Sequence, residues 1–417
     1  MPTEIRPLAE DELPAFAVIA ANAYPAFQAH SAEERHTIVQ RWIAQAADPT
    51  ISNVGAFRDG RLVGAMKLYD FTMNVRGAQL PTGGVGMVAV DLLHKKQRVA
   101  FDLIQHFLRH YRERGATLTE LYPFRPDFYK QMGFGYGTKM SEYRARTESF
   151  PAGPGRERLR TLTIADAPAL LECYNRYQAA THGMIRRDEF SFPRRFANPA
   201  HHAIGYERDG RLTGYLLFDD ATDPNGNFVL NDLIVEELVY ETPDALAALL
   251  AFLRSQADQF RTVVIRTQDP TFHHLLADPR DDSGRLIPSV YHQSDTQGVG
   301  LMYRVIDLPG VFAALAGRDF NGQTIRLQIT LDDSFFPENA GPVTVAFDSG
   351  QPHVTDDPAH DAAIRLDVAE FSSLLLGAVS FKRLHQYGLA QLSDPSVLEV
   401  IDRLFRVDDP PICMTAF

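Results

Sequence analysis

The sequence predicts a mixed α/β protein in which one domain occurs twice and a third, α+β domain follows. Three observations lead to this fold class. Two stretches near the N-terminus recur about 150 residues later, each copy alternates strand and helix patterns, and the repeat stops near residue 290. We expect mixed, mainly antiparallel sheets, because hairpin patterns join most of the strands in each copy.

The repeat rests on two pairs of matching segments. IRPLAEDELPAF (5–16) matches LRTLTIADAPAL (159–170), and RDGRLVG (58–64) matches RDGRLTG (208–214), at offsets of 154 and 150 positions. Either match alone could be chance, since Asp-Gly hairpins recur in unrelated sheets. Together, in the same order and at nearly the same spacing, they indicate two copies of a domain of typical size.

Each copy opens with a short strand and a helix. An Asp-Gly pair between apolar strands then predicts a type I′ hairpin, at Asp59-Gly60 and again at Asp209-Gly210. The first copy continues with a strand through GVGMVAV and with a helix from about residue 97 to 113, whose apolar residues recur at helical spacing. The strand TLTELYPF, a helical turn at 127–132 and the glycine-rich GFGYG complete it.

The repeat sets the expected domain boundaries. We predict domains at 1–150, 151–290 and 291–417, with PAGPGRER (151–158) as the clearest boundary. The last range contains strands such as TIRLQITL and apolar-faced helices such as FSSLLLGAV, which is typical of an α+β domain. Those helices could line a lipid cavity or form an ordinary core.

Composition narrows the class of function. The net charge of −12 disfavours nucleic acid and anionic membranes as partners. There is no run of eighteen apolar residues, and the N-terminal segment lacks the pattern of a signal peptide, so we expect a cytoplasmic protein. Cys173 and Cys413 allow one disulfide at most and have no metal-ligand spacing, so we expect buried or free thiols and no metal.

The segment VAVDLLHKKQRVAFDL (88–103) is a candidate anion site. An apolar strand passes through a short loop into a helix, and the loop carries Lys95, Lys96 and Arg98. The first turn of a helix presents unpaired N–H groups at the positive end of the helix dipole, which favours phosphate. A solvated cluster of charges is the alternative explanation of these residues.

The second copy distinguishes the two explanations. Its corresponding segment, LIVEELVYETPDALAALLAFL (233–253), keeps the strand and the helix but has Glu241 and Asp244 in place of the basic residues. Carboxylates at this turn would repel a pyrophosphate. The fold therefore does not require a basic turn, and the sequence indicates one anion site per chain, in the N-terminal domain.

These residues carry a family resemblance. VAVDLLHKKQRVA resembles the acyl-CoA-binding segment of the GNAT N-acetyltransferases, and FYKQMGFGYG (128–137) is similar to the segment that follows it in that family. A functional GNAT-like copy, a degenerate second copy and a C-terminal domain resemble the Eis group (enhanced intracellular survival proteins) over the whole chain. The resemblance implies two tandem GNAT-like domains, a C-terminal sterol-carrier-like α+β domain, and acetyl-CoA as co-substrate.

The resemblance also implies site residues. Val88 and Val90 match the strand that binds the pantetheine arm, and the pyrophosphate turn is matched by Lys95, Lys96, Arg98 and Val99. Tyr129 matches the general acid, and the C-terminal carboxylate of Phe417 matches the general base. One position departs from the family, which has glycine near the end of the turn where this chain has Arg98. Glycine lets a phosphate approach the backbone closely, so Arg98 must point its side chain away or clasp the phosphate itself.

The implied acid and base suit acetyl transfer. An amine attacks a thioester only as the free base, and the leaving thiolate needs a proton. Tyrosine, with a pKa of about 10, matches a departing thiol, whereas an α-carboxylate, with a pKa of about 3.5, is a weak base unless burial raises its pKa. Tyr129 could instead be a packed aromatic residue and Phe417 a frayed terminus, although the apolar PPICMTAF (410–417) suits a buried tail.

We therefore expect an acetyl-CoA-dependent N-acetyltransferase that acts on primary amines of a cationic, aminoglycoside-like or lysine-containing substrate. The resemblance further implies a homo-hexamer. Two other functions stay open at the level of sequence: a non-catalytic carrier of a lipid or small molecule, and a protein that senses acyl-CoA without transferring the acyl group.

Overall fold

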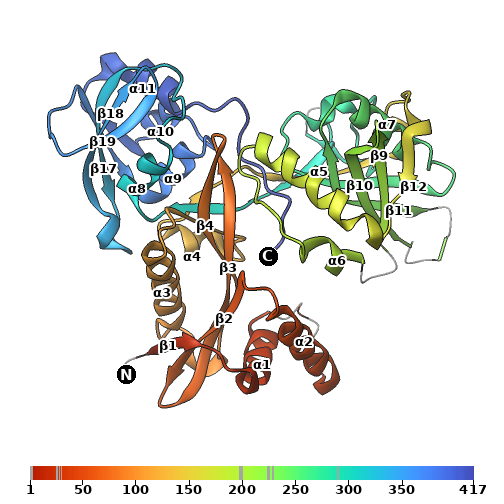
Figure 1. Cartoon of the computed structure of the whole chain (residues 1–417), viewed down its shortest axis with the longest axis horizontal. Helices are drawn as coiled ribbons and strands as arrows, with labels where there is room; N and C mark the ends of the chain where they lie inside the picture. The colour runs from red at the N-terminus through yellow and green to blue at the C-terminus, as the bar shows by residue number, and fades with distance from the viewer. Residues whose placement is uncertain are drawn as a thin grey trace. The chain divides into compact units, whose positions relative to one another are not determined.

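The computed structural model describes residues 3–24, 27, 29, 31–196, 201–222, 226–227, 230–288 and 291–417 (Figure 1). The chain forms two compact units. The first contains residues 1–137, 301–410 and 415–417, and the second contains residues 138–300 and 411–414. The C-terminal tail is therefore divided between the two units.

The first unit contains a seven-stranded sheet with the order β1-β2-β3-β4-β5-β16-β6. Neighbouring strands are antiparallel except for the parallel pair β4 and β5, so the sheet is mixed and mainly antiparallel, as predicted. The strands are β1 Glu4–Pro7, β2 Ile51–Arg58, β3 Arg61–Val75, β4 Ala78–Val90, β5 Leu118–Leu121, β6 Gly135–Tyr136 and β16 Met302–Val305.

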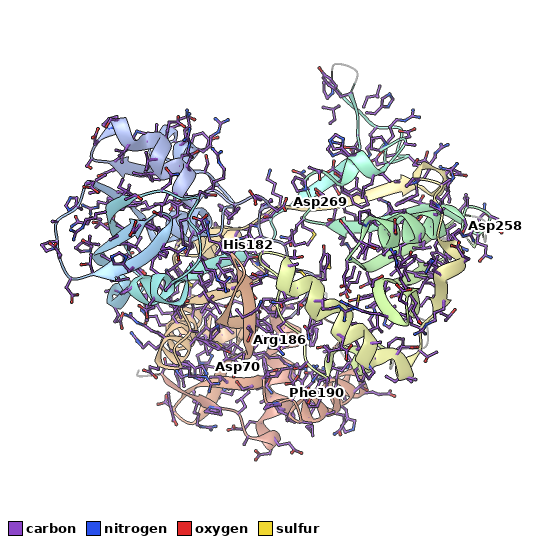
Figure 2. All side chains as sticks on the ribbon, turned by 45° about the horizontal axis from the view of Figure 1, so that its top comes forward. Asp70, His182, Arg186, Phe190, Asp258 and Asp269 are labelled. Carbon is purple, nitrogen blue, oxygen red and sulfur yellow. The ribbon has the colours of Figure 1, made fainter. Side chains whose placement is uncertain are left out.

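Helices cover both faces of this sheet (Figure 1). α3 (Val99–Glu113) and α4 (Pro126–Lys130) pack on one face through a large apolar core, close to the ranges predicted for them. α1 (Leu13–Ala23) and α2 (Ala32–Gln45) form a second core on the other face. Asp70 of β3, labelled in Figure 2, anchors the end of α3, because its carboxylate accepts hydrogen bonds from the Tyr111 hydroxyl at 2.9 Å and from Arg114 at 2.6 Å.

The second unit repeats this topology. Its sheet has the order β15-β7-β12-β11-β10-β9-β8, with β11 and β12 as the parallel pair. The duplication predicted from the sequence is thus confirmed. The elements are β7 Met140–Arg146, β8 Leu159–Thr161, α5 Ala167–Ala180, α6 Ser191–Phe196, β9 His202–Arg208, β10 Arg211–Ala221, β11 Asn231–Tyr240, α7 Pro243–Arg254, β12 Phe260–Thr267, β13 Leu286–Ile287, β14 Tyr291–His292 and β15 Asp295–Gly298.

Both predicted hairpins are present. Asp59 and Gly60 have φ angles of +49° and +74°, and Asp209 and Gly210 have +52° and +74°. Two consecutive positive φ angles define a type I′ turn, whose twist matches that of the flanking strands. The Asp-Gly prediction is therefore confirmed in both copies.

Each seven-stranded sheet contains one strand that the predicted domain boundaries assign to a different domain. β16, which follows the second copy in sequence, lies between β5 and β6 in the first sheet. β7, which ends the first copy in sequence, pairs with β12 in the second sheet. The boundaries 1–150, 151–290 and 291–417 stay a prediction, and sheet pairing does not follow them.

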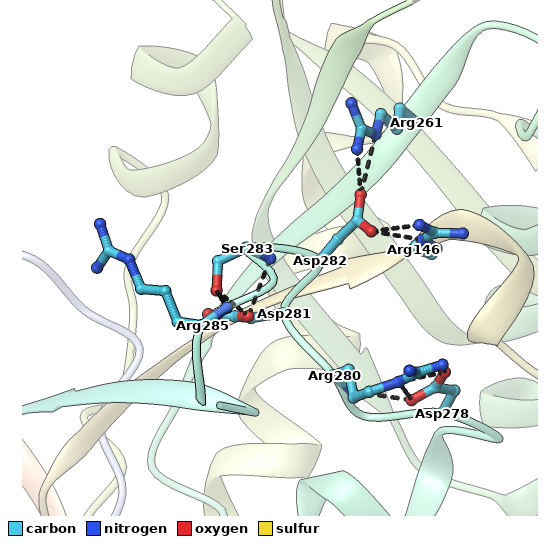
Figure 3. Close-up of polar contacts among 8 residues, drawn as sticks. All are labelled: Arg146, Arg261, Asp278, Arg280, Asp281, Asp282, Ser283 and Arg285. Carbon is cyan, nitrogen blue, oxygen red and sulfur yellow. Dashed lines mark hydrogen bonds and ion pairs between the residues drawn. The ribbon is translucent and has the colours of Figure 1, made fainter. Parts of the chain in front are cut away.

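Arginine–carboxylate contacts fix the segment that follows β12 in the second unit (Figure 3). The carboxylate of Asp282 accepts hydrogen bonds from Arg146 of β7 at 2.6 Å and from Arg261 of β12 at 2.9 Å. Burial alone would raise the pKa of Asp282, but the hydrogen bonds from these two guanidinium groups lower it below its usual value. This carboxylate therefore ties the segment to two neighbouring strands.

The remaining part of the first unit is an α+β layer, as predicted, with a five-stranded sheet in the order β19-β18-β17-β20-β21. Its core is filled by buried phenylalanines, among them Phe312, Phe320 and Phe371. The elements are α8 Leu308–Ala314, β17 Ile325–Asp332, β18 Gly341–Asp348, β19 Gln351–Thr355, β20 Ala362–Asp367, α9 Val368–Leu375, α10 Phe381–Gln386, β21 Ala390–Leu392 and α11 Leu398–Phe405.

A buried ion pair joins this layer to the first sheet. The guanidinium of Arg304 on β16 binds both carboxylate oxygens of Asp333 at 2.8 Å, and the two side chains are 0% and 1% exposed. The same guanidinium donates to the carbonyl of Gly133 at 3.3 Å, at the start of the GFGYG segment. Separately, no helix in the described part of the chain is long and apolar enough to cross a membrane.

Short 3-10 helices connect many of these elements. They are η1 Glu10–Glu12, η2 Leu92–His94, η3 Thr147–Ser149, η4 Arg156–Arg158, η5 Ile164–Asp166, η6 Phe272–Leu275, η7 Pro337–Asn339 and η8 Pro395–Val397. The acidic residues Glu10, Asp11 and Glu12 form η1 immediately before α1. They still lie at the positive end of the helix dipole, where carboxylates are favourable.

Candidate active site

The end of β4 is open on one side. β4 pairs with β5 only from Thr82 to Gly84, whereas its pairing with β3 continues to Val90. A register shift, together with a φ of +52° at Met87, marks a β-bulge in this last stretch. Main-chain groups on the β5 side of residues 85–90 are therefore free of ladder hydrogen bonds, and Val88 and Val90 lie in this stretch.

Tyr24, at the end of α1, binds the same stretch. Its hydroxyl donates a hydrogen bond of 2.8 Å to the carbonyl oxygen of Val88. Burial raises the pKa of Tyr24 to about 12, so its hydroxyl remains a proton donor at neutral pH. One of the two predicted pantetheine-binding residues therefore already has a side-chain partner.

The basic turn follows directly. Asp91 accepts a hydrogen bond from the amide of Leu93 at 3.0 Å and contacts the ring of His94 at 2.8 Å, which fixes the start of the turn. Lys95 and Lys96 are exposed, and Lys96 has a φ of +63°. The turn thus presents two lysine side chains to solvent immediately before α3.

Arg98 adopts the backbone conformation that the family assigns to glycine. It occupies the N-cap position of α3 with φ +66° and ψ +6°, in the left-handed region. Its guanidinium lies over the ring of Phe101, 5.1 Å from the ring centroid. The left-handed conformation of this non-glycine residue is kept at a cost of about 1–2 kcal/mol.

The N-termini of the two corresponding helices differ. No side chain caps α3, so the amides of its first turn, beginning with Val99, are open. In the second copy, Thr242 accepts a hydrogen bond from the amide of Ala245, and Pro243 removes an N–H group from the first turn of α7. Glu241 beside it binds Arg176. An anion at the N-terminus of α3 would therefore meet main-chain N–H donors, whereas at the N-terminus of α7 it would meet the carboxylate of Glu241.

Tyr129 is 4% exposed and lies on α4. Its ring is packed against Phe128 and Phe134, at centroid distances of 5.4 and 6.0 Å. Burial, and to a smaller extent the neighbouring Tyr24, raise its pKa above the usual value. A packed aromatic ring and a proton-donating hydroxyl are thus compatible in Tyr129, because its hydroxyl is protonated at neutral pH.

Phe417 lies on the face of the sheet opposite α3. A Cβ atom added at Gly86 of β4 would come within 3.2 Å of the Phe417 main-chain carbonyl carbon, so the terminus lies directly against this glycine. The ring packs against Tyr69, Phe71 and Tyr122, at centroid distances of 5.5, 4.9 and 5.2 Å. The terminus is therefore packed in place on β4, two residues from Val88.

The preceding part of the tail is held in the second unit. The amide of Ile412 donates to the carbonyl of His182, labelled in Figure 2, at 3.0 Å, and the amide of Cys413 donates to the side chain of Gln268 at 2.7 Å. Arg187 donates to the carbonyl of Met414 at 3.3 Å. The tail is bound through its backbone at three successive residues, as the apolar PPICMTAF segment suggested. Cys173 and Cys413 are both buried thiols, as predicted.

The predicted site residues all belong to the first unit, and they follow β4 and the helix after it. Val88, Val90 and Phe417 lie at the open stretch, and Lys95 to Val99 form the turn. Tyr129 belongs to the apolar core beneath α3, against which Val88 and Val90 pack. Sequence reasoning missed Tyr24, which no motif marks, and Glu120, a carboxyl within the apolar strand TLTELYPF. In the described part of the chain, no group of three or more His, Cys, Asp or Glu residues could hold a metal ion.

Comparison with family models agrees with this organisation. Residues 4–137 and residues 183–305 each match a model of the acetyltransferase (GNAT) domain, and residues 311–414 match the sterol carrier protein domain. Curated relatives named as uncharacterised N-acetyltransferases share 25–27% identity. One from Streptomyces avermitilis is 26% identical, covering 95% of both chains, and one from Streptomyces coelicolor is 27% identical, covering 79% of this chain and 81% of its own.

Solved structures share the complete fold. A GCN5-related N-acetyltransferase from Kribbella flavida superposes with a TM-score of 0.79 at 20% identity, and Eis1 from Mycobacterium abscessus with 0.77 at 21% identity. Both comparisons cover 100% of each chain. The chain therefore carries two tandem GNAT acetyltransferase domains followed by a sterol carrier protein domain, and it shares the fold of Eis1 over its whole length.

Proposed function

We propose that this acetyltransferase moves the acetyl group of acetyl-CoA to a primary amine of a cationic substrate, aminoglycoside-like or lysine-containing. The observation that carries the proposal is the juxtaposition, on β4, of an open main-chain edge and the C-terminal residue Phe417. The net charge of −12 would also concentrate cationic acceptors near the protein.

In this proposal the first copy alone binds the co-substrate. The free main-chain groups of Val88 and Val90 pair with the pantetheine arm, and for Val88 this means its amide, because its carbonyl is bonded to Tyr24. The pyrophosphate lies at the N-terminus of α3, bound mostly by main-chain N–H groups of the turn and by lysine side chains. The turn residues are Lys95, Lys96, Arg98 and Val99.

The chain's own groups then supply the acid and the base. The Phe417 carboxylate attracts the acceptor ammonium and accepts its proton, and the free amine attacks the thioester carbonyl. Tyr129 gives its proton to the departing thiolate. A tyrosine whose pKa is raised by burial is protonated at every pH at which the amine is reactive, so the acid is always available.

The acceptor class and the assembly rest on the resemblance to the Eis group. We propose a homo-hexamer in the cytoplasm with domains at 1–150, 151–290 and 291–417. Light scattering of the purified protein would test the hexamer, and a monomer or dimer would contradict it.

Release of CoA thiol, with mass spectrometry of the acceptor, tests the reaction. A panel of aminoglycosides, a lysine-containing peptide and a neutral alcohol should show transfer to the amines alone. Tyr129→Phe and deletion of Phe417 should each lower kcat by about 10²-fold or more. Tyr206→Phe, a buried tyrosine of the second copy, is the matched control and should leave kcat unchanged. Full activity in both site variants would contradict the proposed roles.

A further inference from the structure

Glu120, on β5, has a buried carboxyl group without a protein partner. Its side chain is 0% exposed, and neither carboxyl oxygen accepts or donates a hydrogen bond. A buried polar group left without a partner costs folding free energy, so such a group needs an explanation. Glu120 is also the last β5 residue that pairs with β4, opposite Gly84, where the two strands begin to separate.

The register places this carboxyl on the face that carries Phe417. Gly84, its partner, faces Phe71, because a side chain added at Gly84 would meet the Phe71 ring. Gly86, two residues further on the same face, adjoins Phe417. The next residue on β5, Leu121, points to the other face of the sheet, because it packs into the core beneath α3. Glu120 therefore points away from α3 and toward the side of the sheet where the tail ends.

The aromatic rings around the terminus span the position of Glu120. Phe417 contacts Phe71 of β3, which covers Gly84, and also Tyr122, the residue that directly follows β5. The ring of the terminal residue thus reaches from β3 to the end of β5. The terminal carboxyl group lies beside Gly86, and Glu120 lies opposite Gly84, two residues along β4 on the same face of the sheet.

Among the described residues, no cationic side chain contacts the Glu120 carboxyl group. The titratable groups on this side of the sheet are Tyr24 at the end of α1, Tyr69 and Lys67 on β3, Tyr303 opposite Glu120 on β16, Tyr122 after β5, Glu370 on α9 and the terminal carboxylate. Lys67 donates to Gln45 at 2.9 Å, and Glu370 is bound by Lys130. Burial without a compensating partner raises the pKa of Glu120 to about 8.

Such a group solves a chemical difficulty of the proposed site. An alkylammonium has a pKa of about 10.4 and an α-carboxylate about 3.5, so proton transfer between them is unfavourable by a factor of about 10⁷. For an acceptor group with a pKa near that of Glu120, the same transfer is unfavourable by a factor of only about 10²–10³. Ionised Glu120 is therefore a much stronger proton acceptor for the ammonium than the α-carboxylate is.

We propose that Glu120 is the terminal proton acceptor of the reaction, receiving the acceptor's ammonium proton by way of the Phe417 carboxylate. This inference rests on the proposed function. In the full step, Glu120 acts in its ionised form: the ammonium loses one proton to the Glu120 carboxylate, and the nitrogen lone pair forms the bond to the acetyl carbonyl carbon. The C–S bond breaks, and the thiolate takes the Tyr129 proton. The second nitrogen proton restores Tyr129, and the proton on Glu120 leaves to solvent.

The test compares Glu120→Gln and Glu120→Asp with wild type in CoA-release assays from pH 6 to 10. The acceptors are a lysine-type amine and methoxyamine, a weakly basic primary amine that is already a free base at pH 7. For wild type and the lysine-type amine, kcat/KM should rise with pH up to about pH 8. In Glu120→Gln, kcat/KM should no longer rise with pH in this range, and kcat at pH 7 should fall by about 10²-fold or more, with the KM for acetyl-CoA unchanged.

The second acceptor separates proton transfer from a structural role. With methoxyamine, Glu120→Gln should match wild type, because no ammonium proton has to be removed. Glu120→Asp should keep the rise of kcat/KM with pH, since it keeps a carboxyl group. Glu120→Gln could instead lose kcat equally with both acceptors, or show the same rise of kcat/KM with pH as wild type; either result would overturn the proposal for Glu120 alone. A wild-type protein that acetylates no amine would overturn the proposed function and this inference with it.

Discussion

Replacing Glu120 by glutamine should stabilise the fold increasingly as the pH rises. The carboxyl group has a pKa of about 8 in the folded protein and 4.5 as its ordinary value. Below pH 4.5 it is protonated in both the folded and the unfolded chain. Between pH 4.5 and 8 only the unfolded chain ionises, so the stability that Glu120 contributes declines with pH and is lost above pH 8.

The size of this effect follows from the two pKa values. A difference of 3.5 units at 1.36 kcal/mol per unit gives on the order of 5 kcal/mol across the full range. Urea unfolding of wild type and Glu120→Gln at pH 6, 7 and 8 should therefore show a difference in unfolding free energy that grows by about 1.4 kcal/mol per pH unit.

A matched control isolates the buried carboxyl. Glu12 is held ionised by its hydrogen bond to Arg6, which lowers its pKa to about 2, so it does not titrate between pH 6 and 8 in either state. Glu12→Gln should give a difference from wild type that does not change with pH. A constant difference for Glu120→Gln as well would refute the assignment of Glu120 as a buried, neutral acid at pH 7.

Two further predictions concern backbone and core. Arg98→Gly should stabilise the protein by about 1 kcal/mol in urea unfolding, because it removes a left-handed non-glycine residue, and it should still bind acetyl-CoA; a destabilised variant would show that the contact with Phe101 matters more. Asp333→Asn should cost about 3–5 kcal/mol of unfolding free energy, since it leaves the buried Arg304 without its counter-charge, whereas the exposed pair variant Asp332→Asn should cost below about 1 kcal/mol. Equal costs for the two aspartates would contradict the burial argument.

Local chemistry made part of this structure predictable. Asp-Gly turns require positive φ angles at both positions, so their sequence defines the hairpin type. The apolar face of α3 is predicted by apolar residues that recur at helical spacing. A comparison of the two copies shows that Glu241 and Asp244 replace the basic residues in the second copy. In each case the determining residues are adjacent in sequence.

The unpredicted features depend on contacts between distant residues. β7 and β16 were readable as strands, but strand periodicity does not say which sheet a strand joins, and each pairs across a predicted boundary. The burial of Glu120 depends on which face of β5 meets Phe417, about 300 positions away, and the hydrogen bond from Tyr24 to Val88 spans 64 positions. No local pattern carries this information.

The most direct test of the account is calorimetric titration of the protein with acetyl-CoA. One site per chain is expected for wild type, and none for Lys95→Glu/Lys96→Glu, which gives the first turn the acidic character of the second. The matched charge reversal Arg156→Glu/Arg158→Glu, at exposed positions of the second unit, should keep that single site. Two sites in wild type, or unchanged binding after the charge reversal at Lys95 and Lys96, would contradict the claim that the basic turn of the first copy alone binds the co-substrate.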